Sequence, residues 1–123
     1  MIRGIGIDLC PISYMTDEKH RSLLMERWYS DIERAYVAAR GEAAAQTAAG
    51  FFAAKEATLK ALGTGLFGIS LRDVEIRHND LGVPILFLYG AAMERAEKLG
   101  ARHGHLSITH AADMAAGVCI LEG

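Results

Sequence analysis

The sequence has few of the features that mark a secreted or membrane protein. It holds only two cysteines in 123 residues, and both lie in apolar segments far apart, so we expect Cys10 and Cys119 to be buried free thiols rather than a disulfide framework. No run of about 18 apolar residues is present, which excludes a transmembrane helix. Asp8 and Pro11 interrupt the N-terminal stretch, whereas a signal peptide needs an unbroken apolar core, so we expect a cytoplasmic protein.

An excess of one charge is also lacking. Thirteen Lys and Arg residues against fifteen Asp and Glu residues give a formal net charge of −2, which excludes a nucleic-acid binder that relies on bulk positive charge. Apolar residues make up 51% of the chain and charged residues 23%, which is typical of globular proteins rather than disordered ones. Domains contain roughly 100–200 residues, so we predict a single domain over residues 1–123.

The apolar pattern predicts an α+β fold, with a mostly antiparallel sheet packed against a long helix. Residues 2–9 alternate with a period of two and predict a strand whose second face is bare, because Gly4 and Gly6 carry no side chain. Ser30 and Glu33 have the spacing of a helix capping box. The further elements that we expect are a short helix within 16–27, helices at 31–39, 42–62 and 91–99, a hairpin of strands at 74–76 and 85–88, and strands at 105–109 and 115–121.

Three patches in the first half carry residue types used in catalysis or binding, and each has an ordinary structural alternative. Asp8 follows a glycine-rich strand, a position suited to a functional group or to a turn. Glu56 and Lys60 share one face of the long helix, which suits a metal ion and its anion, or a surface ion pair. Residues 63–65 read Gly-Thr-Gly and follow that helix, where backbone amides approach a phosphate or simply end the helix.

A fourth patch is rich in histidine and hydroxyl groups. On a strand, His105, Ser107 and Thr109 share one face, while Leu106 and Ile108 face the core. Three histidines within residues 103–110 raise the possibility of a zinc site, but the distant cysteines do not complete a ligand set. A Ser–His nucleophile pair is the other alternative, although no nucleophile-elbow sequence surrounds the serine.

In their order and spacing, these patches together resemble the holo-acyl-carrier-protein synthases, the small trimeric group of 4′-phosphopantetheinyl transferases. The matching segments are residues 4–8 (GIGID), 52–57 (FAAKEA) with Lys60, 63–65 (GTG), 73–76 (DVEI), 82–84 (GVP) and 105–110 (HLSITH). The resemblance implies a magnesium-dependent transfer of the phosphopantetheine group from coenzyme A to a serine of an apo acyl carrier protein, releasing adenosine 3′,5′-bisphosphate.

The resemblance also assigns roles to residues. It implies that Asp8 and Glu56 bind Mg²⁺ and are catalytic together with Lys60, which meets the diphosphate of coenzyme A. It further implies a homotrimer in which coenzyme A lies between neighbouring subunits. The remaining coenzyme A contacts that it implies are Gly63, Thr64 and Gly65 from one chain and Gly82, Pro84, Ser107, Thr109 and His110 from the adjoining chain.

Some positions depart from the pattern of this family. Pro11 and Tyr14 stand where family members usually carry Glu and Arg for docking the acidic carrier, and Phe51 stands where an Arg is common. We therefore hypothesise that the magnesium–coenzyme A chemistry is retained while the carrier partner or its affinity has changed. The alternative is a catalytically impaired homologue that only binds coenzyme A or a carrier protein. Possible docking cations are Lys19, Arg21, Arg27 and Arg34.

Two roles stay open at this point. A water on the magnesium, Glu33 and His110 are all candidates for the base that takes the proton from the carrier serine. Lys55 is either a second phosphate contact or a solvated helix charge, and we favour the solvated charge.

Overall fold

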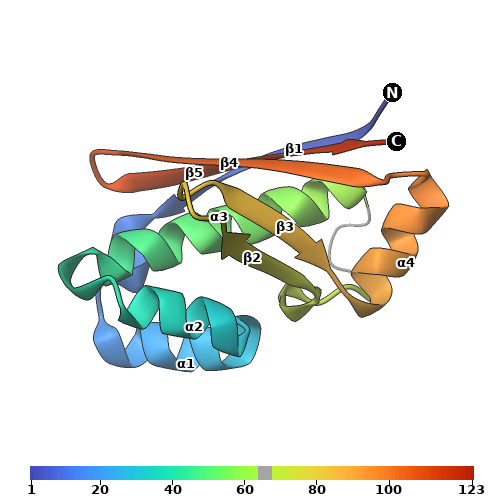
Figure 1. Cartoon of the computed structure of the whole chain (residues 1–123). Coiled ribbons are helices and arrows are strands. Elements are labelled where there is room, and N and C mark those ends of the chain that lie inside the picture. The colour runs from blue at the N-terminus through green and yellow to red at the C-terminus, as the bar shows by residue number, and fades with distance from the viewer. Residues whose placement is uncertain (64–67) are drawn as a thin grey trace.

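The computed structural model describes residues 1–63 and 68–123 as an α+β protein built around one long helix (Figure 1). In chain order the strands and helices are β1 (Ile2–Pro11), α1 (Glu18–Trp28), α2 (Asp31–Ala38), α3 (Ala44–Leu62), β2 (Val74–His78), β3 (Pro84–Leu88), α4 (Gly90–Leu99), β4 (His103–Ala111) and β5 (Met114–Glu122). The predicted elements are all present, with ends that differ by a few residues. Ser30 and Glu33 form the expected capping box at the start of α2.

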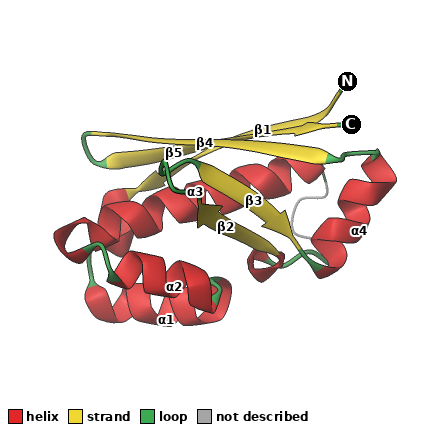
Figure 2. Ribbon diagram, in the orientation of Figure 1, coloured by secondary structure: helices red, strands yellow, loops and turns green. Residues whose placement is uncertain are grey.

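The strands form two antiparallel sheets, one of three strands in the order β1-β5-β4 and one hairpin of β2 and β3 (Figure 2). Helix α3 lies between the three-stranded sheet and the α1–α2 pair. Among the described residues, no helix is both long and apolar enough to cross a membrane.

The bare face of β1 is where α3 packs. A Cβ atom added at Gly6 would lie 1.9 Å from the carbonyl oxygen of Ala57, and one at Gly4 would lie 2.0 Å from that of Ala61. A contact this short is sterically impossible, so only glycine lets the strand and helix backbones approach so closely. The bare face that Gly4 and Gly6 predict is thus covered by α3, and the close packing fixes the position of β1 relative to the end of α3.

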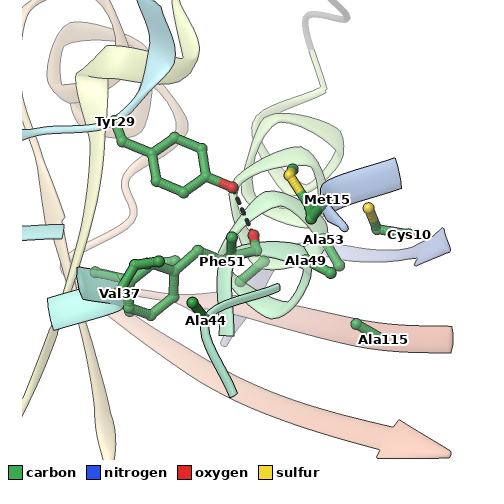
Figure 3. Close-up of a cluster of buried hydrophobic side chains, with 12 residues drawn as sticks. Cys10, Met15, Tyr29, Val37, Ala44, Ala49, Phe51, Ala53 and Ala115 are labelled. Carbon is green, nitrogen blue, oxygen red and sulfur yellow. Dashed lines mark hydrogen bonds between the residues drawn. The ribbon is translucent and has the colours of Figure 1, made fainter. Parts of the chain in front are cut away.

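The rings of Tyr29 and Phe51 lie among small and aliphatic side chains in the core beside α3 (Figure 3). Phe51 is 1% exposed, and its ring centroid lies 5.5 Å from that of Tyr36 and 6.3 Å from that of Tyr29. His78 stacks on Tyr36 with ring centroids 4.2 Å apart. The position where the family resemblance leads us to expect an Arg is therefore occupied here by a core residue. Cys10 and Cys119 are buried free thiols, as expected.

The outer face of the three-stranded sheet is apolar along β1 and β5. Ile5, Ile7 and Leu9 of β1 keep 65%, 64% and 59% of their surface exposed. Residues paired across an antiparallel ladder point to the same face. The partners of these three side chains in β5 are Ile120, Val118 and Ala116. A continuous apolar surface therefore covers β1 and β5 on the side away from α3.

Candidate active site

Asp8 and Lys60 are brought together by the packing of β1 on α3. Lys60 lies in the last turn of α3, and its Nζ donates to Asp8 Oδ1 at 2.8 Å and to the carbonyl oxygen of Ile7 at 3.1 Å. The Lys60 side chain is 55% exposed and that of Asp8 is 22% exposed. The pair thus lies at the surface, where a ligand can reach it.

Glu56 lies one turn before Lys60 and interacts electrostatically with both members of this pair. Burial raises the pKa of Glu56, the negative charge of Asp8 raises it further, and the positive charge of Lys60 lowers it in part. The pKa of Cys10 is raised to about 11, first by burial and then by the charges of Asp8 and Glu56. The two acids, which come from different elements, therefore both act electrostatically on the same small region.

The two carboxylates fit a magnesium ion by the chemistry of their atoms. Within residues 1–63 and 68–123, no three His, Cys, Asp or Glu side chains gather closely enough to hold a metal ion. Magnesium needs only one or two carboxylates when substrate phosphates and waters complete its octahedral shell. A divalent cation held by Asp8 and Glu56 would also offset the negative charge of Asp8, which adds to the effect of burial in raising the pKa of Glu56.

A hollow of about 510 Å³ opens beside Glu56. Its described lining is mostly apolar, and it consists of Trp28, Phe52, Glu56, Gly68, Ile69, Ser70 and Leu71. A second hollow, of about 340 Å³, is lined by Ile7, Asp8, Leu9 and Lys60. Glu56 thus borders an apolar recess, whereas Asp8 and Lys60 border a hollow that Ile7 and Leu9 of β1 also line.

The predicted glycine-rich loop begins as expected. Gly63 ends α3 with a φ of 75°, in the left-handed region that favours glycine. Arg95 of α4 donates from Nε to the carbonyl oxygen of Leu62 at 2.9 Å and so caps the end of the helix. Thr64 and Gly65 lie outside the described residues.

The five residues expected from an adjoining chain fall into two groups. Gly82, Pro84 and His110 line one hollow of about 190 Å³. The rest of its lining consists of Tyr36, Thr47, Gly50, Phe51, His78 and Ile108. His110 Nε2 lies 3.0 Å from the carbonyl oxygen of Gln46.

Ser107 and Thr109 lie elsewhere, exposed on the outer face of the sheet, where they pair with Val118 and Ala116. None of the five residues lines the hollows that contain Asp8, Glu56 and Lys60. Within one chain, the two groups and the acidic site are therefore separate.

Two interpretations made from the sequence are corrected. The prediction that Lys55 is a solvated helix charge is wrong, because its side chain is fully buried and its Nζ lies 2.7 Å from Glu33 Oε1. Glu33 is also fully buried, and its carboxylate accepts hydrogen bonds from the backbone N–H groups of Ser30 and Ile76. A carrier serine cannot reach it, which removes Glu33 from the candidates for the base.

No sequence pattern points to His78 as a residue of interest. Its Nδ1 is buried and has no hydrogen-bond partner in the described part of the chain. Burial lowers the pKa of His78, and the nearby charge of Arg40 lowers it further, which favours the neutral ring. This histidine belongs to the aromatic stack on Tyr36 and Phe51 and forms part of the wall behind Gly82 and Pro84.

Comparison with known proteins identifies the family of this chain. The family model described as ACPS, 4′-phosphopantetheinyl transferase superfamily, matches residues 4–119. The holo-[acyl-carrier-protein] synthase of Treponema denticola is 42% identical over 123 residues, which cover 100% of both chains.

Solved structures agree with this match. The crystal structure of holo-[acyl-carrier-protein] synthase from Neisseria meningitidis matches with a TM-score of 0.86 and 31% identity, over 100% of both chains. The holo-(acyl-carrier-protein) synthase of Bacillus anthracis, in complex with CoA (3′,5′-ADP), matches with a TM-score of 0.80 and 36% identity, over 98% of this chain and 96% of that one. The chain therefore belongs to the 4′-phosphopantetheinyl transferase superfamily and, within it, to the holo-[acyl-carrier-protein] synthases, which are transferase enzymes.

Proposed function

We propose that this enzyme transfers the 4′-phosphopantetheine group of coenzyme A to a serine of an apo acyl carrier protein and releases adenosine 3′,5′-bisphosphate. The observation that carries the proposal is the contact of Lys60 with Asp8 beside Glu56. Two acids and an amine in one exposed region suit a diphosphate and the cation that neutralises it. The B. anthracis relative, whose structure contains CoA (3′,5′-ADP), supports this choice of donor.

The transfer exchanges one phosphorus–oxygen bond for another. The serine oxygen of the carrier bonds to the phosphorus of the pantetheine phosphate, and the bond from that phosphorus to the bridging diphosphate oxygen breaks. Adenosine 3′,5′-bisphosphate leaves with the bridging oxygen, and the serine proton passes to a base. In such reactions the protein contributes mainly positioning and charge neutralisation.

In this proposal, Asp8, Glu56 and Lys60 have different roles in positioning the substrate and neutralising its charge. Asp8 and Glu56 would hold Mg²⁺, which when bound offsets the negative charge of the diphosphate. Lys60 is oriented by Asp8 and by the carbonyl oxygen of Ile7, so its ammonium is placed to stabilise charge on the leaving phosphate. The apolar recess lined by Trp28 and Phe52 suits the methyl-bearing pantetheine arm, which lies next to the reacting phosphorus.

We also propose that the enzyme is a homotrimer with its active sites between subunits. The outer face of the sheet exposes Ile5, Ile7 and Leu9, and a large exposed apolar surface of this kind marks an interaction site. Ile7 and Leu9 also line the hollow that contains Asp8 and Lys60. A second copy seated on this face would therefore adjoin the acidic site and supply contacts such as those of Gly82, Pro84 and His110.

The mass of the carrier tests the reaction. Wild-type enzyme, coenzyme A, Mg²⁺ and an apo carrier are incubated together, and the carrier is weighed by mass spectrometry. We expect a gain of about 340 Da, the mass of a phosphopantetheine group on serine. An unchanged carrier mass, together with measurable coenzyme A binding, would instead support a catalytically impaired binding protein.

A further inference from the structure

The buried pair of Glu33 and Lys55 takes no part in the proposed reaction. Both side chains have no exposed surface, and their charged atoms lie 2.7 Å apart. Such a pair is a weak device for stability, because well-packed apolar side chains of similar volume are often as stable or more so. Its contacts therefore need an explanation beyond the pairing of two charges.

Lys55 connects α3 to the segment that leads into β2. A lysine ammonium has three N–H donors. Here they contact Glu33 Oε1 at 2.7 Å, the carbonyl oxygen of Leu71 at 3.1 Å, and the carbonyl oxygen of Val74. Every donor is used, and two of the three acceptors are backbone atoms of the short 3₁₀ turn Leu71–Asp73 and its C-cap. The ammonium therefore determines where this turn lies against the helix.

Glu33, the partner of Lys55, makes hydrogen bonds to the backbone of two further elements. Its Oε1 accepts from the backbone N–H of Ser30 at 2.9 Å, and its Oε2 accepts from that of Ile76 at 2.8 Å. One carboxylate thus joins the start of α2 to strand β2, while its partner Lys55 joins both to α3. With both carboxylate oxygens bonded, the geometry of the pair is strongly defined.

The turn held by Lys55 forms one wall of the hollow beside Glu56. Ile69, Ser70 and Leu71 contribute to the lining of this hollow, and so do Phe52 and Glu56 of α3. Lys55 and Glu56 are consecutive residues of one rigid helix. A movement of the Leu71 carbonyl away from Lys55 would therefore change the distance between Glu56 and the part of the lining that Leu71 contributes.

We infer that Glu33 and Lys55 are positioning residues that set the width of the hollow beside Glu56 and thereby the binding of the coenzyme A donor. The inference rests on the proposed function and adds two residues that touch neither the donor nor the carrier. A mere stability role would predict weaker folding with normal donor binding. A positioning role predicts weaker donor binding in a folded protein.

The double substitution Glu33→Gln with Lys55→Met separates these roles, because it removes both charges and keeps similar side-chain volumes. We expect the KM for coenzyme A to rise about tenfold or more, with a smaller loss in kcat, in a protein that circular dichroism shows to be folded. Hydrogen–deuterium exchange should increase in residues 69–74. The matched control is Val37→Ala, a buried change in α2 that should weaken folding but leave the KM for coenzyme A unchanged.

The outcomes are distinguishable. A wild-type enzyme that transfers nothing contradicts the proposed function. If the wild type is active and the folded double variant has a normal KM for coenzyme A, the positioning role is overturned but the proposed function is not. The same conclusion follows if Val37→Ala raises this KM as much as the double substitution does. If the double variant does not fold, Lys55→Gln replaces it, because its amide donates to only two of the three acceptors. A raised KM in that variant supports the inference, and a normal KM overturns it.

Discussion

Lys60 Nζ lies 2.8 Å from Asp8 Oδ1, although the two residues are 52 positions apart in the sequence. The contact exists because Gly4 and Gly6 let β1 lie directly on the last two turns of α3. The same packing brings Asp8 into electrostatic contact with Glu56. The glycine-rich strand therefore builds the candidate active site as well as the core.

Substituting Lys60 should remove transfer activity without unfolding the protein. We expect Lys60→Met to lower kcat by about 10²–10³-fold, the usual loss when a donor that stabilises charge on a transferring group is deleted. Because the side chain is 55% exposed, the free energy of unfolding should change by no more than about 1 kcal/mol. Steady-state kinetics and urea denaturation provide the two measurements.

The matched control for this prediction is Lys98→Met. Lys98 is an exposed lysine in the last turn of α4, and its removal should leave kcat unchanged. Equal losses of kcat in the two variants would show that overall positive charge, rather than the position of Lys60, supports the reaction.

Adding one methyl group to β1 should damage both stability and the site. A Cβ atom at residue 6 would lie 1.9 Å from the Ala57 carbonyl oxygen, so Gly6→Ala forces strand and helix apart. We expect a loss of about 1–3 kcal/mol in the free energy of unfolding, the usual cost of overpacking, together with reduced transfer activity. Urea denaturation checks the first effect. Glu97→Ala, an exposed change in α4, should alter neither quantity.

Stability at acidic pH should depend on Glu75. Burial alone would raise the pKa of Glu75, but hydrogen bonds from Ser30, Arg77 and Tyr89 outweigh it and hold the pKa below its ordinary value of 4.5. The unfolded chain therefore binds a proton on this group at a higher pH than the folded chain does. The stabilisation is fully present above pH 4.5 and is lost as the pH falls through the lower folded value.

The variant Glu75→Gln lacks this titration. Its free energy of unfolding should fall less steeply than that of the wild type as the pH drops below 4.5, as followed by urea denaturation at several pH values. Parallel pH profiles for the two proteins would contradict the assignment.

Self-association should depend on the outer face of the sheet. Ile7 is 64% exposed and pairs with Val118 of β5 in the middle of the apolar surface. If the proposed trimer forms through this face, we expect Ile7→Lys to convert it to a monomer, because burying an unpaired ammonium in an apolar interface is strongly unfavourable. Analytical ultracentrifugation gives the mass. A wild-type protein that is monomeric, or a variant that keeps the wild-type mass, would show that this face is not the interface.

Much of the fold could be predicted because local patterns determine it. The alternation of residues 2–9, the capping box at Ser30 and the glycine that ends α3 each depend on neighbours in the sequence. For this reason, the sequence predicts correctly that α3 ends at Gly63.

Long-range relationships could not be predicted in the same way. Helical periodicity shows which residues share a face with Lys55, but not that the Leu71–Asp73 turn covers it and buries it. The stack of His78 on Tyr36 and Phe51 joins three separate segments and has no local signature. The approach of Asp8 to the face of α3 that carries Lys60 is likewise expected only from resemblance to a family, because no spacing rule links a strand to a helix so far along the chain.

The most direct test is the magnesium dependence of carrier modification by wild type and by Glu56→Gln, followed by mass spectrometry over a Mg²⁺ titration. If Asp8 and Glu56 hold the ion together, the variant should need at least about tenfold more Mg²⁺ for half-maximal rate and transfer more slowly at saturation, while chelation should stop both enzymes. A variant that matches the wild type at every Mg²⁺ concentration, or a wild type that works fully in excess chelator, would contradict the shared metal site.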